Sequence, residues 1–333
     1  AVADFWQNRK LKTESNIQFG EGGAGTFSDG KLTTRVSDEK MKDILELFVK
    51  AGAPEEIKYL HKPHIGTDKL RNVVKYLRKE IIAAGGEVRF KAKVTDIKIT
   101  EGNISEVILN GQETLPCEVV VLAIGHSARD TYEMLYQRNV ELEAKPFAIG
   151  VRIEHPQELI DKAQYGEYAG AANLAAADYS LVYNDIETKR SAYSFCMCPG
   201  GFVVPAASSS RQVVVNGMSP SNRGSRWANS GMVVEIRPED YSELMKHEEM
   251  AVSKDSPLAL MAFQERLEEL CWLNGGMKQT APAQRMVDFV NKKNSFDLPD
   301  SSYTPGLLAS PLHFWMPEFV TGRLREGFRH FGK

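Results

Sequence analysis

Residues 16–34 read NIQFGEGGAGTFSDGKLTT, and this stretch decides whether the chain begins as a Rossmann dinucleotide-binding fold. Gly20, Gly22 and Gly25 match the G-x-G-x-x-G spacing of such a fold. A Rossmann loop also needs a buried strand before it and a helix that starts inside it. Here the preceding TESNIQF is polar, and the following TFSDGKLTT carries Asp-Gly and a Thr pair where a helix should start. We therefore expect a different kind of glycine loop.

The glycine-rich segment is still suited to contact a ligand. Glycine lets the backbone approach closely and allows positive φ, and successive free N–H groups can form an anion-binding nest. A surface loop with glycine turns is the alternative interpretation. The small residues from Gly22 to Thr26 favour ligand contact. The candidate cofactor-binding residues of this segment are Gly20, Gly22, Gly23, Ala24, Gly25, Thr26, Ser28, Asp29 and Lys31.

The totals describe an ordinary globular chain that is long enough for two domains, with 333 residues and a net charge of −3. This charge predicts no attraction to nucleic acid or anionic membranes, and without a run of about 18 apolar residues we expect no membrane span. The opening residues lack the apolar stretch of a signal peptide and an initiator Met, which indicates a processed chain or an excised piece. Four irregularly spaced cysteines fit a reducing compartment, so we expect a cytoplasmic protein.

Residues 1–145 are expected to form an α/β region. Helices are predicted at 37–52, with Ser37 as a cap, and from Thr67 or Asp68 to the Gly85-Gly86 stop. The run CEVVVLAIG predicts a strand covered on both faces, followed by a helix that Ser127 caps. The predicted strands of this region are 87–90, 93–99, 104–110 and 117–125, with hairpin turns at Gly102-Asn103 and Asn110-Gly111.

The pattern changes after Pro146, where apolar residues alternate between clusters of Gly, Asn, Ser and Pro. This alternation predicts a mostly antiparallel sheet, joined by a helix over 256–276. We therefore predict two domains: an α/β domain at 1–145 and a β-rich domain with helices at 146–333.

Several long strings resemble the FAD-dependent dehydrogenases known as NAD(FAD)-utilizing dehydrogenases, a branch of the two-dinucleotide-binding flavoprotein superfamily. These strings are GEGGAGTFSDGKL, VVLAIGHSA, FCMCPGG, VVNGMSPSNRGSRWANSG and TAPAQRMVDF. In that family a Rossmann loop lies upstream and a flavin-contacting segment ends the chain. Neither is found here, so the resemblance implies a fragment that lacks both ends of the FAD domain. It thus implies that 1–145 is a partial FAD-binding, Rossmann-like α/β domain and that 146–333 is a β-rich substrate domain with helices.

The resemblance also implies where a cofactor would lie. The segment from Gly20 to Lys31 would approach the flavin and pyrophosphate, and Val94 matches the position at which the family's backbone reads adenine. Ala123 and Gly125 match a turn near the cofactor, where Ile124 replaces the family's usual Thr. His126, which follows that turn, could hydrogen-bond the cofactor or could simply lie near a helix cap.

Three residues are candidates for catalysis. Cys196 and Cys198 stand at i and i+2 on a predicted strand, so both are expected to point to one face. They could form a redox dithiol, place one thiol toward flavin or substrate, or be two small buried side chains. Arg223, in a loop rich in Ser, Asn and Gly, could bind a carboxylate or phosphate, or be an ordinary solvated charge. No cluster has zinc-ligand spacing, so we expect no metal site.

These observations predict an FAD-dependent oxidoreductase, or its substrate-domain fragment, that transfers a hydride between FAD and a small-molecule substrate, with NAD(P)H as a possible electron partner. The main alternative is a non-catalytic module that binds a ligand or partner and does not hold FAD by itself. A nicotinamide enzyme that uses residues 20–25 directly is a third reading, which the polar flanks argue against.

Overall fold

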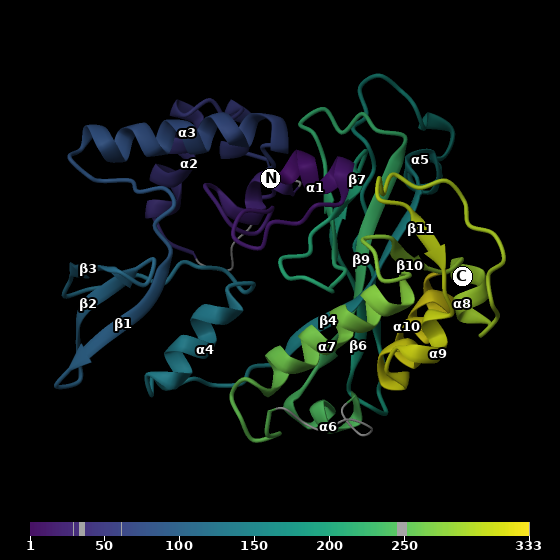
Figure 1. Cartoon of the computed structure of the whole chain (residues 1–333). Helices are drawn as coiled ribbons and strands as arrows, with labels where there is room; N and C mark the ends of the chain where they lie inside the picture. Colours follow the sequence, from purple (N-terminus) through teal and green to yellow (C-terminus); the bar gives the residue numbers. More distant parts are fainter. Residues whose placement is uncertain (29, 33–36, 61, 245–251, 333) are drawn as a thin grey trace. The chain divides into compact units, whose positions relative to one another are not determined.

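The computed structural model describes all residues except 29, 33–36, 61, 245–251 and 333 (Figure 1). The chain divides into two compact units. The sheet unit comprises Ala1–Leu77, Phe147–Ile236 and Glu265–Lys333, and the meander unit comprises Arg78–Pro146 and Arg237–Gln264. This division differs from the two consecutive domains that the sequence analysis expects, because residues 1–77 group with the β-rich region. An FAD-binding domain at 1–145 stays a prediction.

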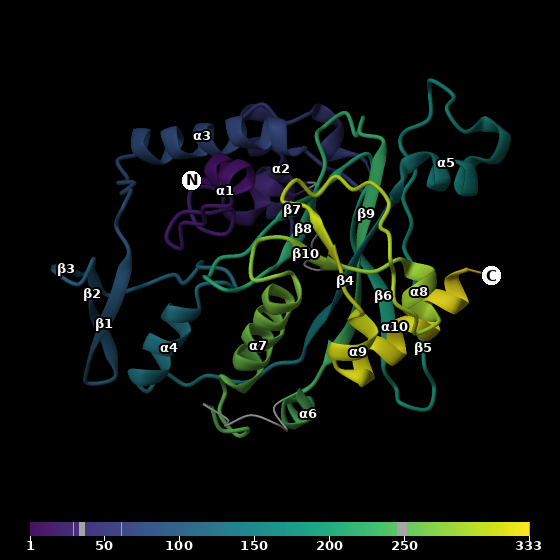
Figure 2. The same cartoon turned by 45° about the vertical axis from the view of Figure 1, so that its right-hand side comes forward.

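A four-stranded antiparallel sheet forms the centre of the sheet unit, and Figure 2 shows its long strands side by side. The alternating apolar residues after Pro146 predicted this sheet, and the structure confirms it. The central strand β9 is almost entirely buried, because it pairs on both sides with β4 and β6. The strand order is β4 (Phe147–Pro156), β9 (Trp227–Ile236), β6 (Ser191–Cys198) and β5 (Val182–Asn184).

Two short strand pairs accompany the sheet. An antiparallel pair joins β7 (Phe202–Pro205) to β8 (Val215–Met218). A parallel pair joins β10 (Ala281–Ala283) to β11 (Leu307–Ala309). Buried residues connect the two pairs in one apolar cluster made of Val203, Val213, Ala281 and Tyr303. The helix predicted at 256–276 is confirmed as α7 (Ala259–Asn274).

Helix α10 (Glu318–Phe331) packs against all four strands of the sheet. Its buried face includes Val320, Leu324 and Phe328. Gly327 allows the close approach, since a Cβ there would lie 3.1 Å from the Cβ of Ala192 on β6. Shorter helices in this unit are α1 (Val2–Asn8), α5 (Gln157–Tyr165), η3 (Gly166–Tyr168), α8 (Met286–Val290) and α9 (Leu312–Trp315).

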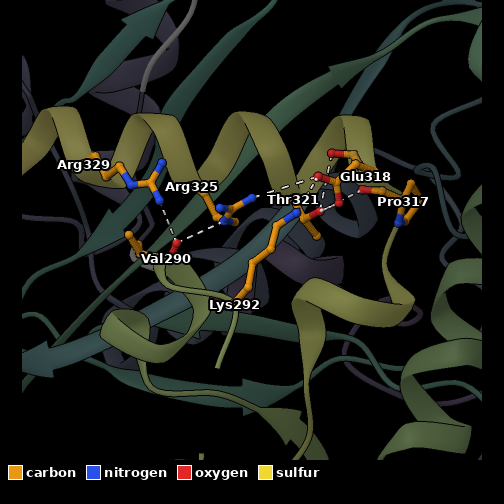
Figure 3. A network of polar contacts seen from close by, with 7 residues as sticks. All are labelled: Val290, Lys292, Pro317, Glu318, Thr321, Arg325 and Arg329. Atoms are coloured by element: carbon orange, nitrogen blue, oxygen red, sulfur yellow. Dashed lines mark hydrogen bonds and ion pairs between the residues drawn. The ribbon is translucent and has the colours of Figure 1, made fainter. Parts of the chain in front are cut away.

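Polar contacts join α10 to the end of α8 and to Lys292 just after it (Figure 3). Arg325 Nε and Arg329 Nη2 both donate to the carbonyl oxygen of Val290, each at 3.1 Å. Lys292 Nζ lies 3.2 Å from Glu318 Oε1 at the other end of the helix. Two guanidinium groups on one carbonyl satisfy the last carbonyl of α8, which has no partner within its own helix.

The N-terminal part of the sheet unit contains η1 (Gly23–Phe27), α2 (Lys40–Lys50), η2 (Glu55–Lys58) and the start of α3 (Thr67–Ala83). Both predicted helices are confirmed, and Gly85 ends α3 with a φ of 87°. Helix α2 begins later than expected, with Glu39 rather than Ser37 at its N-cap. Asp38 Oδ1 accepts the N–H of Lys40 at 2.8 Å, which supplies the cap interaction that Ser37 was expected to give.

The meander unit is built on the antiparallel strands β1 (Val94–Thr100), β2 (Asn103–Leu109) and β3 (Glu113–Pro116). Positive φ at Asn110 and Gly111 confirms the predicted turn. Helix α4 (Arg129–Gln137) packs on β1, where Arg138 Nε donates to Asp96 Oδ1 at 2.7 Å. Residues 87–90 form no strand, contrary to the prediction. The unit also contains η4 (Pro238–Asp240), α6 (Tyr241–Leu244) and the first turns of α7.

The prediction of a doubly covered strand at 117–125 is wrong for the structure. Cys117 N–H still donates to Ser105 O at 3.0 Å, but no regular strand follows. Val119 is 79% exposed and Val121 is 84% exposed, because no strand or helix of the described meander unit covers them. Helix α4 then begins at Arg129 with Ala128 as N-cap, so the predicted Ser127 cap is also wrong.

We expect Leu324→Ala to lower the free energy of unfolding of the sheet unit by about 2–5 kcal/mol, since it leaves a cavity between α10 and the sheet. Leu324 has no exposed surface. Thermal and urea unfolding followed by circular dichroism would measure the loss. Leu159→Ala, at a 58% exposed position on α5, is the control and should cost less than about 1 kcal/mol. Equal losses in both variants would contradict the packing of α10.

The double variant Val119→Thr/Val121→Thr should keep the unfolding transition and reduce the fluorescence of the apolar dye ANS. Replacing exposed apolar groups changes stability by less than about 0.5 kcal/mol. Val107→Thr is the matched control, because Val107 is buried in the meander core. The hydroxyl of the introduced threonine would be buried away from solvent there, so this variant should lower the free energy of unfolding. A double variant as unstable as Val107→Thr would show that residues 119 and 121 are covered.

Candidate functional site

The centre of the sheet unit holds a group of four polar side chains, Arg152, Cys198, Asn216 and Asn229, which we call the arginine–thiol cluster. Arg152 Nη1 donates to Asn229 Oδ1 at 2.7 Å, and Nη2 donates to Asn216 Oδ1 at 3.4 Å. Cys198 also contacts the guanidinium by a side-chain hydrogen bond. Cys198 and Asn229 are buried, whereas Arg152 keeps some exposed surface.

Strand register explains why these residues meet. Asn229 on β9 pairs with Cys198 on β6, and Arg152 on β4 pairs with Gly231 two residues further along β9. Paired residues, and residues two apart, share one face of a sheet. On β8, Gly217 closes the cluster: a Cβ there would lie 2.2 Å from Asn229 Oδ1, 2.5 Å from Arg152 Nη1 and 2.9 Å from Cys198 Sγ. Only glycine fits.

Among the residues that the structure describes, no carboxylate pairs with the charge of Arg152. Burial lowers the pKa of its guanidinium, and the groups that act in the opposite direction are Cys198, Cys196 and Tyr179. The two oxygen atoms that accept hydrogen bonds from this guanidinium belong to the neutral side-chain amides of Asn216 and Asn229. In addition, Asn229 Nδ2 is buried with no hydrogen-bond partner among the described residues. The cluster therefore holds a desolvated cation and a spare donor, an arrangement that favours a negative charge nearby.

His155 and Tyr179 form a second polar pair beside the cluster. His155 Nε2 lies 3.1 Å from the Tyr179 hydroxyl, and the Tyr179 N–H donates to Met197 Sδ at 3.0 Å. Burial lowers the pKa of His155 and raises the pKa of Tyr179 to about 12. Both side chains are therefore neutral at pH 7, with the imidazole as a proton acceptor or donor to the phenol.

Cys196 and Cys198 do not share a face, contrary to the prediction. Strand β6 pairs with β9 through Phe195 and again at Cys198, with a register shift between them. Cys196 lies in this bulge with a φ of 46°, which non-glycine residues rarely adopt. The bulge breaks the strand alternation, so Cys196 is exposed while Cys198 is buried. The Cys198 thiol donates to the backbone carbonyl oxygen of Cys196, with an Sγ–O distance of 3.5 Å.

The glycine-rich segment reaches this bulge from the N-terminal part of the same unit. Lys31 Nζ donates to the carbonyl oxygen of Met197, which lies between the two cysteines. Lys31 also bridges to His64, and Gly30 O accepts the N–H of Ile65 at 3.0 Å. The glycine-rich segment and the segment that carries the two cysteines therefore meet within the sheet unit.

Within the glycine-rich segment, the Thr26 and Ser28 hydroxyls donate hydrogen bonds to backbone carbonyls of the same segment. Thr26 Oγ1 donates to Gly23 O at 2.9 Å, and Ser28 Oγ donates to Gly25 O at 3.1 Å. Gly22, with a φ of 82°, is fixed by packing, because a Cβ there would lie 2.4 Å from Thr26 Cγ2. Gly20 has open space at its Cβ position, Gly23 has only the Gln18 carbonyl oxygen at 3.6 Å, and Ala24 lies in η1. Asp29 lies outside the described residues.

Gly25 differs from the other glycines of this segment. Its φ lies outside the left-handed region, and a Cβ would meet no atom within 4 Å. Neither backbone conformation nor packing within the chain therefore requires a glycine at this position. Contact of the segment with FAD stays a prediction.

The turn Pro199–Gly201 links the arginine–thiol cluster to a cavity. Gly200 N–H donates to Gln157 Oε1 at 2.8 Å, and a Cβ on Gly200 would lie 1.6 Å from Arg223 O. The cavity has a volume of about 540 Å³ and is lined by Gln157, Tyr165, Ala172, Arg223, Arg226 and Trp227, among others.

Arg223 therefore lies on the wall of this cavity, as a loop residue with a φ of 46°. Its neighbour Arg226 lies over the Trp227 ring at 4.5 Å from the ring centre and contacts Asp300 at 3.3 Å. The cavity wall carries two guanidinium groups, from Arg223 and Arg226, and two carboxylates, from Glu158 and Asp161. Whether Arg223 binds a carboxylate or phosphate stays a prediction.

The remaining predicted cofactor residues lie in the meander unit. Val94 begins β1 and is 38% exposed. Ala123 and His126 are exposed, and Gly125 has a φ of 72° with open space at its Cβ position. Tyr132 of α4 donates a hydrogen bond to Gly125 O at 3.3 Å, which holds this turn at the start of the helix. Their role toward a cofactor stays a prediction.

Sequence reasoning missed Arg152, His155, Tyr179, Asn216 and Asn229. The usable signal was in VRIEH, where an arginine interrupts the apolar residues of a strand that was correctly predicted. A charged residue in the middle of a sheet must find a polar partner, so it marks a buried polar site. The partners come from strands far apart in the sequence, and only the register of the sheet identifies them.

Within the described residues, no three His, Cys, Asp or Glu side chains are grouped so that they could hold a metal ion. A search of the same residues finds no helix with the length and apolar character needed to span a membrane.

Comparison with known proteins places the chain in a family. Residues 146–333 match the model of the family described as "FAD-dependent protein, C-terminal domain-like", and the chain therefore belongs to this family. The matched region includes the arginine–thiol cluster, the Pro199–Gly201 turn and the cavity. The family supports an association with FAD. The fold is mixed, with helices and mainly antiparallel sheets, while a partial Rossmann-like domain is not confirmed.

A protein of Clostridium beijerinckii (strain ATCC 51743 / NCIMB 8052) named "Uncharacterized protein" is 48% identical over 334 residues. The match covers 100% of this chain and 60% of that relative. The chain thus spans about three fifths of the length of the relative that it matches.

The stability of the sheet unit should fall as the pH decreases below 6.5, partly because of His155. Its pKa in the folded state is lowered from 6.5 by burial, so the folded state binds fewer protons than the unfolded state. The stabilising contribution is therefore present above 6.5 and is lost as the pH falls through the folded-state pKa. His155→Gln should flatten this slope in thermal unfolding between about pH 5 and pH 8.

His126→Gln is the control for this experiment, because His126 is an exposed residue of the other unit. It should keep the pH dependence of the unsubstituted chain. An unchanged slope in His155→Gln would mean that the imidazole is not buried in its neutral form.

Proposed function

We propose that this chain is part of an FAD-dependent oxidoreductase that transfers a hydride between FAD and a small-molecule substrate. The observation that carries the proposal is the family match over residues 146–333, which contains the arginine–thiol cluster and the adjacent cavity. Membership in a family named for FAD dependence favours redox chemistry. A polar site with a desolvated arginine and two cysteines is consistent with a reacting centre.

The glycine-rich segment supports the proposal on the side of the cofactor. Neither packing nor backbone conformation requires a glycine at position 25, and the space at its Cβ position is open. A ligand surface could therefore lie against it. Residues Gly20 to Gly25 would form this contact wall, with Lys31 behind it at Met197. FAD would supply the isoalloxazine that accepts or donates the hydride, and the protein would supply position and exclusion of water.

The cavity supports the proposal on the side of the substrate. Arg223 and Arg226 bring two guanidinium groups to its wall, and Trp227 and Tyr165 provide aromatic surface. Guanidinium groups bind carboxylates and phosphates by paired hydrogen bonds. We therefore propose an anionic substrate with an apolar part, bound beside the Pro199–Gly201 turn. NAD(P)H is a candidate electron partner of the complete enzyme.

A second candidate function is a non-catalytic module that binds a ligand or partner and does not hold FAD by itself. The observation that favours it is the internal use of the Thr26 and Ser28 hydroxyls, which leaves fewer donors for a pyrophosphate. The two candidates differ in one measurable property, namely whether this chain binds flavin.

Titration of the purified chain with FAD, followed by flavin fluorescence and absorbance near 450 nm, tests the proposal. We expect saturable binding that Gly25→Val weakens at least about tenfold, which corresponds to about 1.4 kcal/mol. Gly322→Val is the matched control, because a Cβ there would also meet only one distant atom, at 3.9 Å, and valine is tolerated in a helix better than glycine. The control should bind FAD unchanged.

Absence of saturable FAD binding would favour the non-catalytic module. If FAD binds, anaerobic addition of NADH or NADPH should bleach its absorbance when the reduced nicotinamide is the electron donor. Bound flavin that Gly25→Val does not affect would place the cofactor away from the glycine-rich segment.

A further inference from the structure

The cavity beside the Pro199–Gly201 turn carries a carboxylate that an anionic substrate does not explain. Asp161 of α5 lies on the cavity wall and is half-buried. Its Oδ1 accepts the backbone N–H of Ala177 at 2.9 Å and Gln157 Nε2 at 2.8 Å. Among the residues that the structure describes, neither a hydrogen bond nor an ion pair reaches Oδ2. A carboxylate that lines a cavity and is partly removed from water favours a cationic group in that cavity.

The second carboxylate of the wall is already compensated. Glu158 Oε1 lies 2.5 Å from Lys162 Nζ, one turn further along α5, and both side chains are exposed to solvent. Water and the neighbouring ammonium therefore balance the charge of Glu158. Asp161 has no such ion pair among the described residues, so it is the carboxylate of this wall that a ligand cation would best satisfy.

The loop that contains Arg223 supplies the opposite charge. Arg223 is half-buried on the cavity wall, whereas Arg226 is exposed, contacts Asp300 at 3.3 Å and lies over the ring of Trp227. A guanidinium binds a carboxylate through two parallel hydrogen bonds. Arg223, as the less exposed of the two, is the better placed to take a ligand carboxylate, and Arg226 adds to the positive charge of this loop.

Gln157 holds the two charged groups at a fixed separation. Its backbone N–H donates to Arg226 O at 2.8 Å, and its Oε1 accepts the N–H of Gly200 at 2.8 Å. Its Nε2 donates to Asp161 Oδ1 and also to Ala177 O at 3.0 Å. Gln157 is 6% exposed, so this network is shielded from water. The arrangement of the carboxylate and the arginine loop is therefore set before a ligand binds, which lowers the entropic cost of binding.

The surface between the charged groups is largely apolar. Trp227, Tyr165 and Leu174 line it, together with four alanines of the segment 171–176. The Tyr165 hydroxyl donates to Ala175 O at 3.0 Å, so the chain itself uses the polar end of this ring. A volume of about 540 Å³ is in the range of sites for small organic molecules.

We propose that this cavity binds an amino acid with an apolar side chain. Asp161 would accept the ammonium group, Arg223 would bind the carboxylate, and the surface formed by Trp227, Tyr165 and Leu174 would contact the side chain. The inference rests on the proposed function, because it names the substrate class of the same site. A ligand with a carboxylate alone would leave Asp161 without a cation, whereas a zwitterion satisfies both charges. Gln157 is a positioning residue, since it holds Asp161 and the arginine loop rather than the ligand.

Calorimetric titration of the chain without FAD tests this inference. The probes are L-phenylalanine and L-leucine. Each is compared with the acid that lacks its amine (3-phenylpropionate, 4-methylpentanoate) and with the amine that lacks its carboxylate (2-phenylethylamine, 3-methylbutylamine). We expect saturable binding of an amino acid, and binding at least about tenfold weaker for its acid and its amine, because each analogue leaves one charged group of the cavity unpaired.

Two variants assign the charges to residues. Asp161→Asn keeps Oδ1 as the acceptor for the Ala177 N–H and should weaken amino-acid binding at least about tenfold, without weakening binding of the acid. Arg223→Asn, which suits the left-handed backbone at this position, should weaken both the amino acid and the acid but not the amine. Glu167→Gln is the matched control, because it removes an exposed carboxylate of η3 that does not line the cavity. It should bind all ligands unchanged.

The opposed effects on acid and amine distinguish a binding role from a structural one, since a distorted cavity would weaken every ligand. Far-ultraviolet circular dichroism establishes that each variant is folded. If Asp161→Asn does not fold, the comparison of amino acid, acid and amine on the unsubstituted chain still decides. An acid that binds as tightly as its amino acid would overturn the inference, as would equal weakening of acid and amino acid by Asp161→Asn.

Absence of saturable binding of both amino acids would also overturn the inference. None of these measurements requires flavin. Amino-acid binding by a chain that fails to bind FAD would therefore reject the proposed oxidoreductase alone and leave a binding module. FAD binding without amino-acid binding would reject the amino-acid site alone.

Discussion

The largely desolvated guanidinium of Arg152 is the constraint on which the centre of the sheet unit depends. Its charge lies among strands β4, β8, β9 and β6, so every residue that faces it must either accept a hydrogen bond or leave room. Asn216 and Asn229 do the first, and Gly217 does the second. A mainly apolar sheet would be more simply stabilised by a hydrophobic residue at this position, which makes a structural explanation for the arginine weak.

The cluster and its surroundings form a connected series of contacts within the sheet unit. The Pro199–Gly201 turn leads from Cys198 to the cavity wall at Arg223, and Lys31 leads from the bulge to the glycine-rich segment. Redox chemistry needs a cofactor surface, a substrate surface and a reacting group within reach of one another. Lys31 and Met197, which are 166 positions apart in the sequence, are brought together here through a backbone carbonyl.

Much of this fold could be predicted from the sequence, because local patterns determined it. The alternating strands after Pro146, the helix ended by Gly85 and the turn at Asn110-Gly111 follow from periodicity and turn chemistry. Residues 117–125 illustrate the limit, since an apolar run indicates that a segment can be buried but does not show what covers it. The site was only partly predictable. The two cysteines were recognised, but the bulge that separates them arises from pairing with β9. Arg152 could be assigned to the site only once its pairing with β9 was known.

The Lys31 contact has a consequence for how a bound cofactor could influence the thiols. The ammonium holds the carbonyl of Met197, the residue that follows the left-handed Cys196. A ligand phosphate that attracted Lys31 would release this carbonyl and allow Cys196 to relax toward extended backbone. Occupancy of the glycine-rich segment would then be transmitted mechanically to the bulge, so that the reactivity of the exposed thiol would report whether the cofactor is in place.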